Sequence, residues 1–252
     1  MSEIQHAPLQ GLSEGPDPVS TIPAVDRRVR WAGLLIVLAV AILPFLISST
    51  MHVVGIPPLV SGPYSLYRLL NALLIEVTSL ALLLYVLHQN GQSLGDIGVR
   101  FRFADIGHGI LLIVGSRLVF RIAYWSIVRL YELEFGHAPP RYISPLVGAG
   151  MAVSLLFAVI NPFFEELIVR AFLISEATLL TGSAGLAVIV SVLLQTSYHL
   201  YQGIPNAVGD GLMFLAFSVY YAKTRRLWPV IFAHLWLDVF AVIFYHLHAR
   251  TH

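Results

Sequence analysis

The chain has 252 residues, of which 57% are hydrophobic and only 12% are charged, and its formal net charge is +1. This composition is far too apolar for a water-soluble globule of this length, and a net charge near zero argues against a nucleic-acid partner. Because the chain has no cysteine, disulfides, thiolate metal sites and a cysteine nucleophile are excluded. The composition therefore predicts an integral membrane protein that contacts the lipid bilayer.

The first 26 residues differ from the rest of the chain. They mix proline, glycine, serine and acidic side chains without a helical period, which is typical of a disordered tail. Behind this tail, Arg27, Arg28 and Arg30 precede an apolar run of about 20 residues that begins at Trp31. Because that run is long enough to cross a bilayer and longer than a signal-peptide core, we expect an uncleaved first transmembrane helix.

Six further apolar runs follow, and they are separated by short segments that hold glycine, proline or charged residues. Each run is read as one membrane-spanning helix. We therefore predict an all-α, polytopic membrane protein with seven transmembrane helices over residues 31–50, 66–88, 106–130, 144–180, 184–199, 206–222 and 227–246.

Basic residues in the short connections predict the orientation in the membrane. They occur as Arg27, Arg28 and Arg30 in the tail, Arg100 and Arg102 in the second connection, and Lys223, Arg225 and Arg226 in the sixth. With seven helices these segments alternate with basic-poor ones and lie on one side, which the positive-inside rule makes cytoplasmic. We expect a cytoplasmic N-terminus, a C-terminus on the far side, and location in the plasma (inner) membrane.

Three charges interrupt the second and third apolar runs. Glu76 lies near the middle of the second run, and Arg117 and Arg121 lie four residues apart, on one helical face, in the third. An unpaired charge in the bilayer costs about 3 kcal/mol, so the first expectation is an ion pair between the two helices. The alternative is that these charges position a substrate.

The fourth run contains three ionisable residues, Glu165, Glu166 and Arg170, within an otherwise apolar sequence. Facing lipid, they would together cost about 9 kcal/mol, so they must face inward. On an α-helix Glu166 and Arg170 are one turn apart and pair with each other, whereas Glu165 lies about 100° around the helix. Glu165 is then available for chemistry. The alternative reading is that both glutamates only close a polar contact between helices.

Three more polar groups are expected at the depth of Glu165. Glu165 and His199 are equidistant in sequence from the turn at Gly182, so an antiparallel hairpin would place them at one level. His234 lies about 14 Å above the basic connection that precedes it, and Asp238 follows one turn later on the same face. A carboxylate beside an imidazole polarises water for attack on a carbonyl, and further histidine and acid groups bind a metal or an oxyanion. An ion or proton path needs the same residue types.

These residues also carry a resemblance to a known family. The sequences Glu165-Glu166-x-x-x-Arg170, His199 at the end of the next helix, and His234-x-x-x-Asp238 resemble the three signatures of the CPBP family. That family comprises CAAX prenyl proteases of the glutamate type and bacterial relatives linked to bacteriocin processing and immunity. The similarity covers about residues 146–240, which divides the chain into three N-terminal helices over 27–143 and a protease core over 144–252.

The resemblance implies a role for each matched residue. Glu165 would activate water with His199 beside it, Glu166 and Arg170 would support Glu165, and His234 with Asp238 would complete the catalytic site. Two positions depart from the family pattern. Gln195 replaces the usual phenylalanine, which we expect to affect packing on the substrate side rather than catalysis. Asp238 stands where asparagine is common, and a carboxylate favours metal binding or a protonated His234, whereas an amide would donate to an oxyanion.

The predicted function is an intramembrane endopeptidase that hydrolyses a membrane-attached peptide or protein, with or without a prenyl group. By ligand type, Glu165, His199, His234 and Asp238 would suit zinc, and they serve a metal-free mechanism equally well. Two alternatives use the same residues, namely an ion- or proton-coupled transporter and a catalytically silent immunity or scaffold protein of the family. The absence of a repeated pair of broken helices disfavours the transporter.

Overall fold

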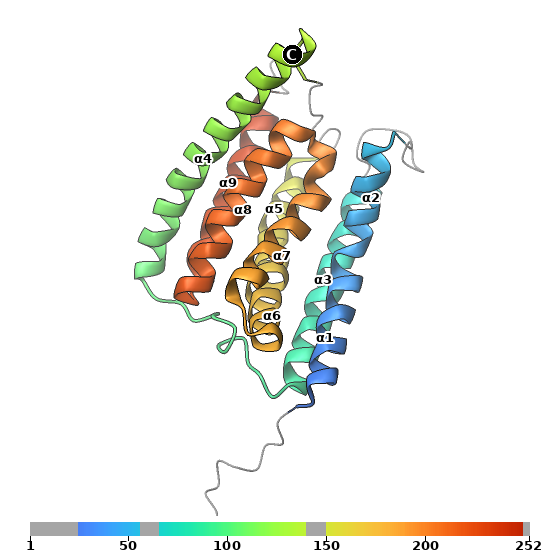
Figure 1. The fold of residues 1–252 in the computed structure, drawn as a ribbon, viewed down its shortest axis with the longest axis vertical. Coiled ribbons are helices and arrows are strands. Elements are labelled where there is room, and N and C mark those ends of the chain that lie inside the picture. Colours follow the sequence, from blue (N-terminus) through green and yellow to red (C-terminus); the bar gives the residue numbers. More distant parts are fainter. Residues whose placement is uncertain (1–24, 56–65, 140–149, 249–252) are drawn as a thin grey trace, which may run out of the picture.

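The computed structural model describes residues 25–55, 66–139 and 150–248, and every regular element in these ranges is a helix (Figure 1). The predicted disordered tail, apart from its last two residues, lies outside the described part. The elements are α1 (Arg27–Ala41), α2 (Leu43–Val53), α3 (Leu66–Gln89), α4 (Ala104–Phe135), α5 (Met151–Glu165), the π-helix η1 (Glu166–Phe172), α6 (Leu173–Thr181), α7 (Ala184–His199), the 3₁₀ turn η2 (Leu200–Gln202), α8 (Ile204–Thr224) and α9 (Trp228–His248). The all-α prediction is confirmed.

The predicted number of seven membrane-spanning helices is not confirmed. In the described ranges, five helical stretches are long and apolar enough to cross a membrane, or six if the bent pair α1 and α2 forms one span. That pair bends by 48° at Ile42, next to Pro44 near the start of α2. The predicted segment that does not qualify is α8, which carries Asp210 and Lys223 among its 21 residues.

The three basic clusters gather at one end of the bundle. Arg30 forms an ion pair with Glu176 of α6 at 3.0 Å. Across the same end, Arg226 Nε donates to Asp105 Oδ1 of α4 at 2.7 Å, and the backbone N–H of Leu227 donates to the carbonyl of Gly98. The alternation of basic and basic-poor connections predicted that the basic residues would lie together at one end. That this end faces the cytoplasm stays a prediction.

Helices α6 and α7 form the predicted hairpin. Helix α6 ends at Thr181, and Gly182 follows with φ +75°, a left-handed conformation that glycine adopts without strain. The Ser183 hydroxyl then accepts a hydrogen bond from the Leu186 N–H and caps α7. This register places His199, the last residue of α7, at the level of Glu165.

The fourth predicted span is not a regular α-helix. Pro162 lies inside α5, where it lacks the N–H that would bond to the carbonyl of Ala158. The π-helix η1 begins four residues later and continues to Phe172. A π-helix has more residues per turn, because its hydrogen bonds run from i to i+5. The 100° offset expected between successive side chains therefore does not hold beyond Glu165.

The predicted ion pair of Glu76 with Arg117 or Arg121 is wrong. A connection of 14 residues carries the chain from α3 to α4, which lie on opposite sides of the bundle (Figure 1). Arg117 and Arg121 are exposed on α4. Glu76 is fully buried where α3 packs on α1 and α5, and neither of its carboxyl oxygens has a hydrogen-bond partner among the described residues.

The burial of Glu76 leads to a prediction about stability. Glu76→Leu removes an unpartnered polar group from a packed position, so we expect the free energy of unfolding to rise by about 1–3 kcal/mol. Thermal melting in detergent measures this change. Glu76→Gln, which keeps two unpartnered polar atoms, is the matched control and should give no such gain. A lower melting temperature for Glu76→Leu than for Glu76→Gln would contradict the conclusion that the Glu76 carboxyl group is buried without a partner.

Candidate active site

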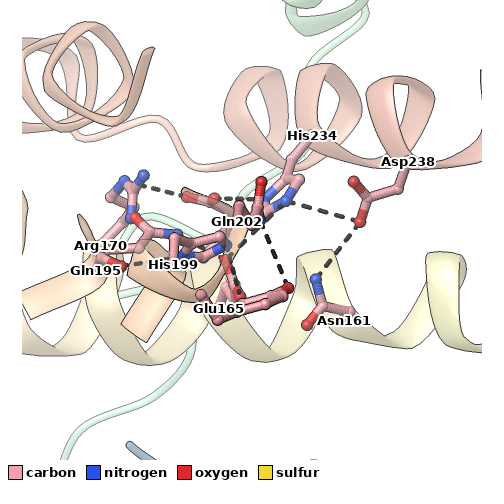
Figure 2. A network of polar contacts seen from close by, with 10 residues as sticks. Asn161, Glu165, Arg170, Gln195, His199, Gln202, His234 and Asp238 are labelled. Carbon is pink, nitrogen blue, oxygen red and sulfur yellow. Dashed lines mark hydrogen bonds and ion pairs between the residues drawn. The ribbon is translucent and has the colours of Figure 1, made fainter. Parts of the chain in front are cut away.

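All six site residues predicted from the sequence lie in one network of polar contacts (Figure 2). Glu165 is the last residue of α5, and Glu166 and Arg170 lie on η1. His199 ends α7, and His234 and Asp238 lie one turn apart on α9. The network thus joins side chains from α5, η1, α7 and α9.

Glu166 has two partners rather than one. Its Oε2 lies 3.4 Å from Arg170 Nε, which is the pair expected from the sequence. Its Oε1 accepts a hydrogen bond from His234 Nδ1 at 2.8 Å. Both Glu166 and Arg170 are fully buried. The predicted pair of Glu166 and Arg170 is therefore confirmed, and His234 is a second partner of Glu166 that the sequence analysis assigned to Glu165.

Glu165 lies between the two histidines. Its Oε1 is 4.0 Å from His199 Nε2, and its Oε2 is 4.0 Å from His234 Nε2. The Nδ1–H of His199 donates to the backbone carbonyl of Gln195 at 2.9 Å, and that of His234 donates to Glu166. Because each ring is held through Nδ1, each presents Nε2 toward Glu165. A gap of 4.0 Å is too long for a direct hydrogen bond and leaves room for a small group between them.

Gln195 is part of the network, and its expected role in packing alone is wrong. Its Nε2 donates to Glu165 Oε2 at 2.6 Å, and its Oε1 accepts a hydrogen bond from Arg170 Nη1. The side chain is fully buried. Gln195 thus links the Glu166–Arg170 pair to Glu165 and fixes the orientation of that carboxylate. A polar amide in an apolar run, one turn before His199, was the feature of the sequence that could have indicated this contact.

Asp238 closes the network on its open side. Its Oδ2 lies 3.7 Å from His234 Nε2 and accepts a hydrogen bond from Asn161 Nδ2 at 3.4 Å. Asn161, one turn before Glu165 on α5, was not singled out in the sequence. The side chain of Asp238 is 31% exposed and that of His199 is 13% exposed, against 6% for Glu165. Asp238 and His199 are therefore more accessible than Glu165, which lies behind them in the network.

The four zinc ligands expected from the sequence do not form one group of coordinating atoms. Within the described ranges, the histidine and acid side chains whose ligand atoms lie within 4.8 Å of one another are Glu165, Glu166 and His234. His199 and Asp238 lie outside that group. Glu166 is already neutralised by Arg170 and by the hydrogen bond from His234, which a metal would have to displace. Glu166 and the Nδ1 atom of His234 are therefore committed to each other, whereas Glu165 and the two Nε2 atoms keep free donor positions.

Comparison with known proteins identifies the segment that holds this network. Residues 147–240 match the family model described as type II CAAX prenyl endopeptidase, Rce1-like. The match contains all six predicted site residues and leaves α1 to α4 outside. The resemblance inferred from the three short motifs is thereby confirmed. Comparisons with curated proteins and with solved structures gave no match.

Proposed function

Residues 147–240 form a domain of the Rce1-like family of type II CAAX prenyl endopeptidases, and from this premise we propose that the protein hydrolyses membrane-attached peptides with a water activated by Glu165. The family supports a membrane-embedded protease. The mechanism, the substrate and location in the plasma (inner) membrane are parts of the proposal.

The observation that carries the proposal is the placement of Glu165 between two imidazole rings. The carboxylate is held by Gln195 on one oxygen, and the Nε2 atoms of His199 and His234 each lie 4.0 Å from it. A general base must be within hydrogen-bond reach of the proton that it removes, directly or through one water. A water that hydrogen-bonds Glu165 and one imidazole satisfies this condition.

The steps of hydrolysis follow from the position of Glu165 between His199 and His234. The water oxygen forms a bond to the scissile carbonyl carbon while one water proton passes to Glu165. The carbon–nitrogen bond then breaks, and the departing nitrogen takes a proton from the His199 imidazolium. The proton held by Glu165 then passes to His199 Nε2 through a water that bridges the 4.0 Å gap. The sum is one water consumed, one carboxylic acid and one amine formed.

His234 faces the oxygen of the scissile carbonyl in this mechanism. Its Nδ1–H is fixed by Glu166, and its Nε2 lies near two further carboxylates, Asp238 at 3.7 Å and Glu165 at 4.0 Å. Three acidic neighbours favour the imidazolium form, whose Nε2–H donates to the developing oxyanion. His234 thus supplies the hydrogen-bond donor to the oxyanion. The carboxylate of Asp238 cannot supply it, because an ionised carboxylate only accepts hydrogen bonds.

A cleavage assay on the reconstituted full-length protein tests the proposal. The probe is a pair of peptides with the same CAAX-like C-terminus, one prenylated on its cysteine and one unmodified, and mass spectrometry locates the cleaved bond. We expect the wild type to cut the prenylated peptide and Glu165→Gln to leave it intact. Because the proposed mechanism uses no metal, prior dialysis against a chelator should change the rate less than about twofold.

Two results would contradict this proposal. Ion flux across the liposome membrane without cleavage of either peptide would favour the transporter. Loss of cleavage after chelation, with recovery on adding zinc alone, would contradict the metal-free mechanism while keeping the protease. Dialysis without the chelator is the control for general inactivation.

A further inference from the structure

The hairpin of α7 and α8 places an additional acid beside His199. The two helices are joined by η2 and Gly203, and they are in close contact where Gly211 passes Thr196. A Cβ atom on Gly211 would lie 2.9 Å from Thr196 Oγ1, which is closer than side chains pack. Because the helices run antiparallel, the residue before Gly211 lies at the level of the end of α7. That residue is Asp210.

A second contact shows which face of α8 meets His199. The His199 ring packs on the Phe214 ring with centroids 4.9 Å apart. Phe214 lies one turn after Asp210 on the same face of α8. Asp210 is partly buried, and its charge interacts with that of His199. The face of α8 toward His199 therefore offers an aromatic ring and a carboxylate.

His199 needs an anion at one step of the proposed reaction. Its ring lies among aromatic side chains, Tyr198 at 4.7 Å and Phe214 at 4.9 Å between centroids, and its Nδ1 bonds to a neutral carbonyl. When Glu165 takes the proton of water it loses its charge. Asp210 on the neighbouring helix then supplies a negative charge that acts on the imidazolium of His199, since Asp238 lies against His234 and Asn161.

We propose that Asp210 is a positioning residue of the active site, which acts through His199 by stabilising its imidazolium until the proton reaches the departing amine. The inference rests on the proposed function and adds an acid that lies outside the three motifs. The aspartate of a serine protease also stabilises a histidine imidazolium, there through a direct hydrogen bond.

The test compares Asp210→Asn with Asp210→Glu in the cleavage assay on the prenylated peptide. We expect Asp210→Asn to lower kcat about 10²-fold with little change in KM or melting temperature, which is less than the roughly 10⁴-fold loss for a directly bonded aspartate. Asp210→Glu restores the charge and should recover most of kcat. In single-turnover experiments on a His199→Ala background, Asp210→Asn should add no further loss, because both act through one group. Glu132→Gln, which removes an exposed carboxylate paired with Arg129 on α4, is the control.

The outcomes separate this inference from the function on which it rests. A wild-type protein that cleaves neither peptide overturns the proposed function and the role of Asp210 with it. An unchanged kcat in Asp210→Asn, beside an active wild type and an inactive Glu165→Gln, overturns the role of Asp210 alone. A kcat and melting temperature that fall together, without rescue by Asp210→Glu, would also overturn it, because a structural role would then suffice.

Discussion

Replacing Glu165 with glutamine is expected to lower turnover by about 10²-fold to 10⁴-fold while the protein stays folded. The amide keeps the size and polarity of the carboxylate, and its carbonyl oxygen still accepts the hydrogen bond from Gln195. It cannot remove a proton from water, so the loss falls on kcat. Steady-state cleavage of the prenylated peptide and melting in detergent measure the two effects.

Glu132→Gln is the control for this substitution. It makes the same chemical change to a glutamate that pairs with Arg129 on α4, outside the family segment. We expect its turnover to stay within about threefold of the wild type, since a surface ion pair contributes little to stability. A Glu165→Gln protein that is folded and keeps more than about a tenth of wild-type turnover would rule out Glu165 as the general base.

The second large effect is expected for Glu166→Gln, and here stability and activity fall together. The new amide has a single carbonyl oxygen, which can interact with either Arg170 or His234. The carboxylate has two oxygens and interacts with both. Leaving the fully buried Arg170 without its anion typically destabilises a protein by about 3–5 kcal/mol. Losing the fixed orientation of His234 also weakens the proposed oxyanion contact. Unfolding in detergent and the cleavage assay give the two readouts.

A double substitution distinguishes the two roles of Glu166. Glu166→Gln combined with Arg170→Met removes the buried charge with its partner, so part of the lost stability should return. Activity should not return, because His234 still lacks its carboxylate. If the double variant is as unstable as the sum of the single variants, the two side chains do not interact, and if it regains activity, His234 does not depend on Glu166.

The membrane class and the site residues follow from local features of the sequence. An apolar composition excludes a soluble fold regardless of how the helices pack, and a Gly between two apolar runs places the turn that aligns His199 with Glu165. The cost of a charge in lipid brings Glu165, Glu166 and Arg170 to the interior in any arrangement. These inferences depend on spacing along the chain, and the structure agrees with them.

Which partner each of these side chains meets was decided only by the tertiary structure. The long connection after α3 lets α4 pack on the far side, so Glu76 never reaches Arg117 or Arg121. The π-helix after Pro162 changes the angular spacing, so Glu166 reaches His234 as well as Arg170. Gln195, Asn161 and Asp210 come close to the site from different helices. Sequence periodicity describes one helix at a time, whereas the contacts between helices depend on their packing, which no single segment encodes.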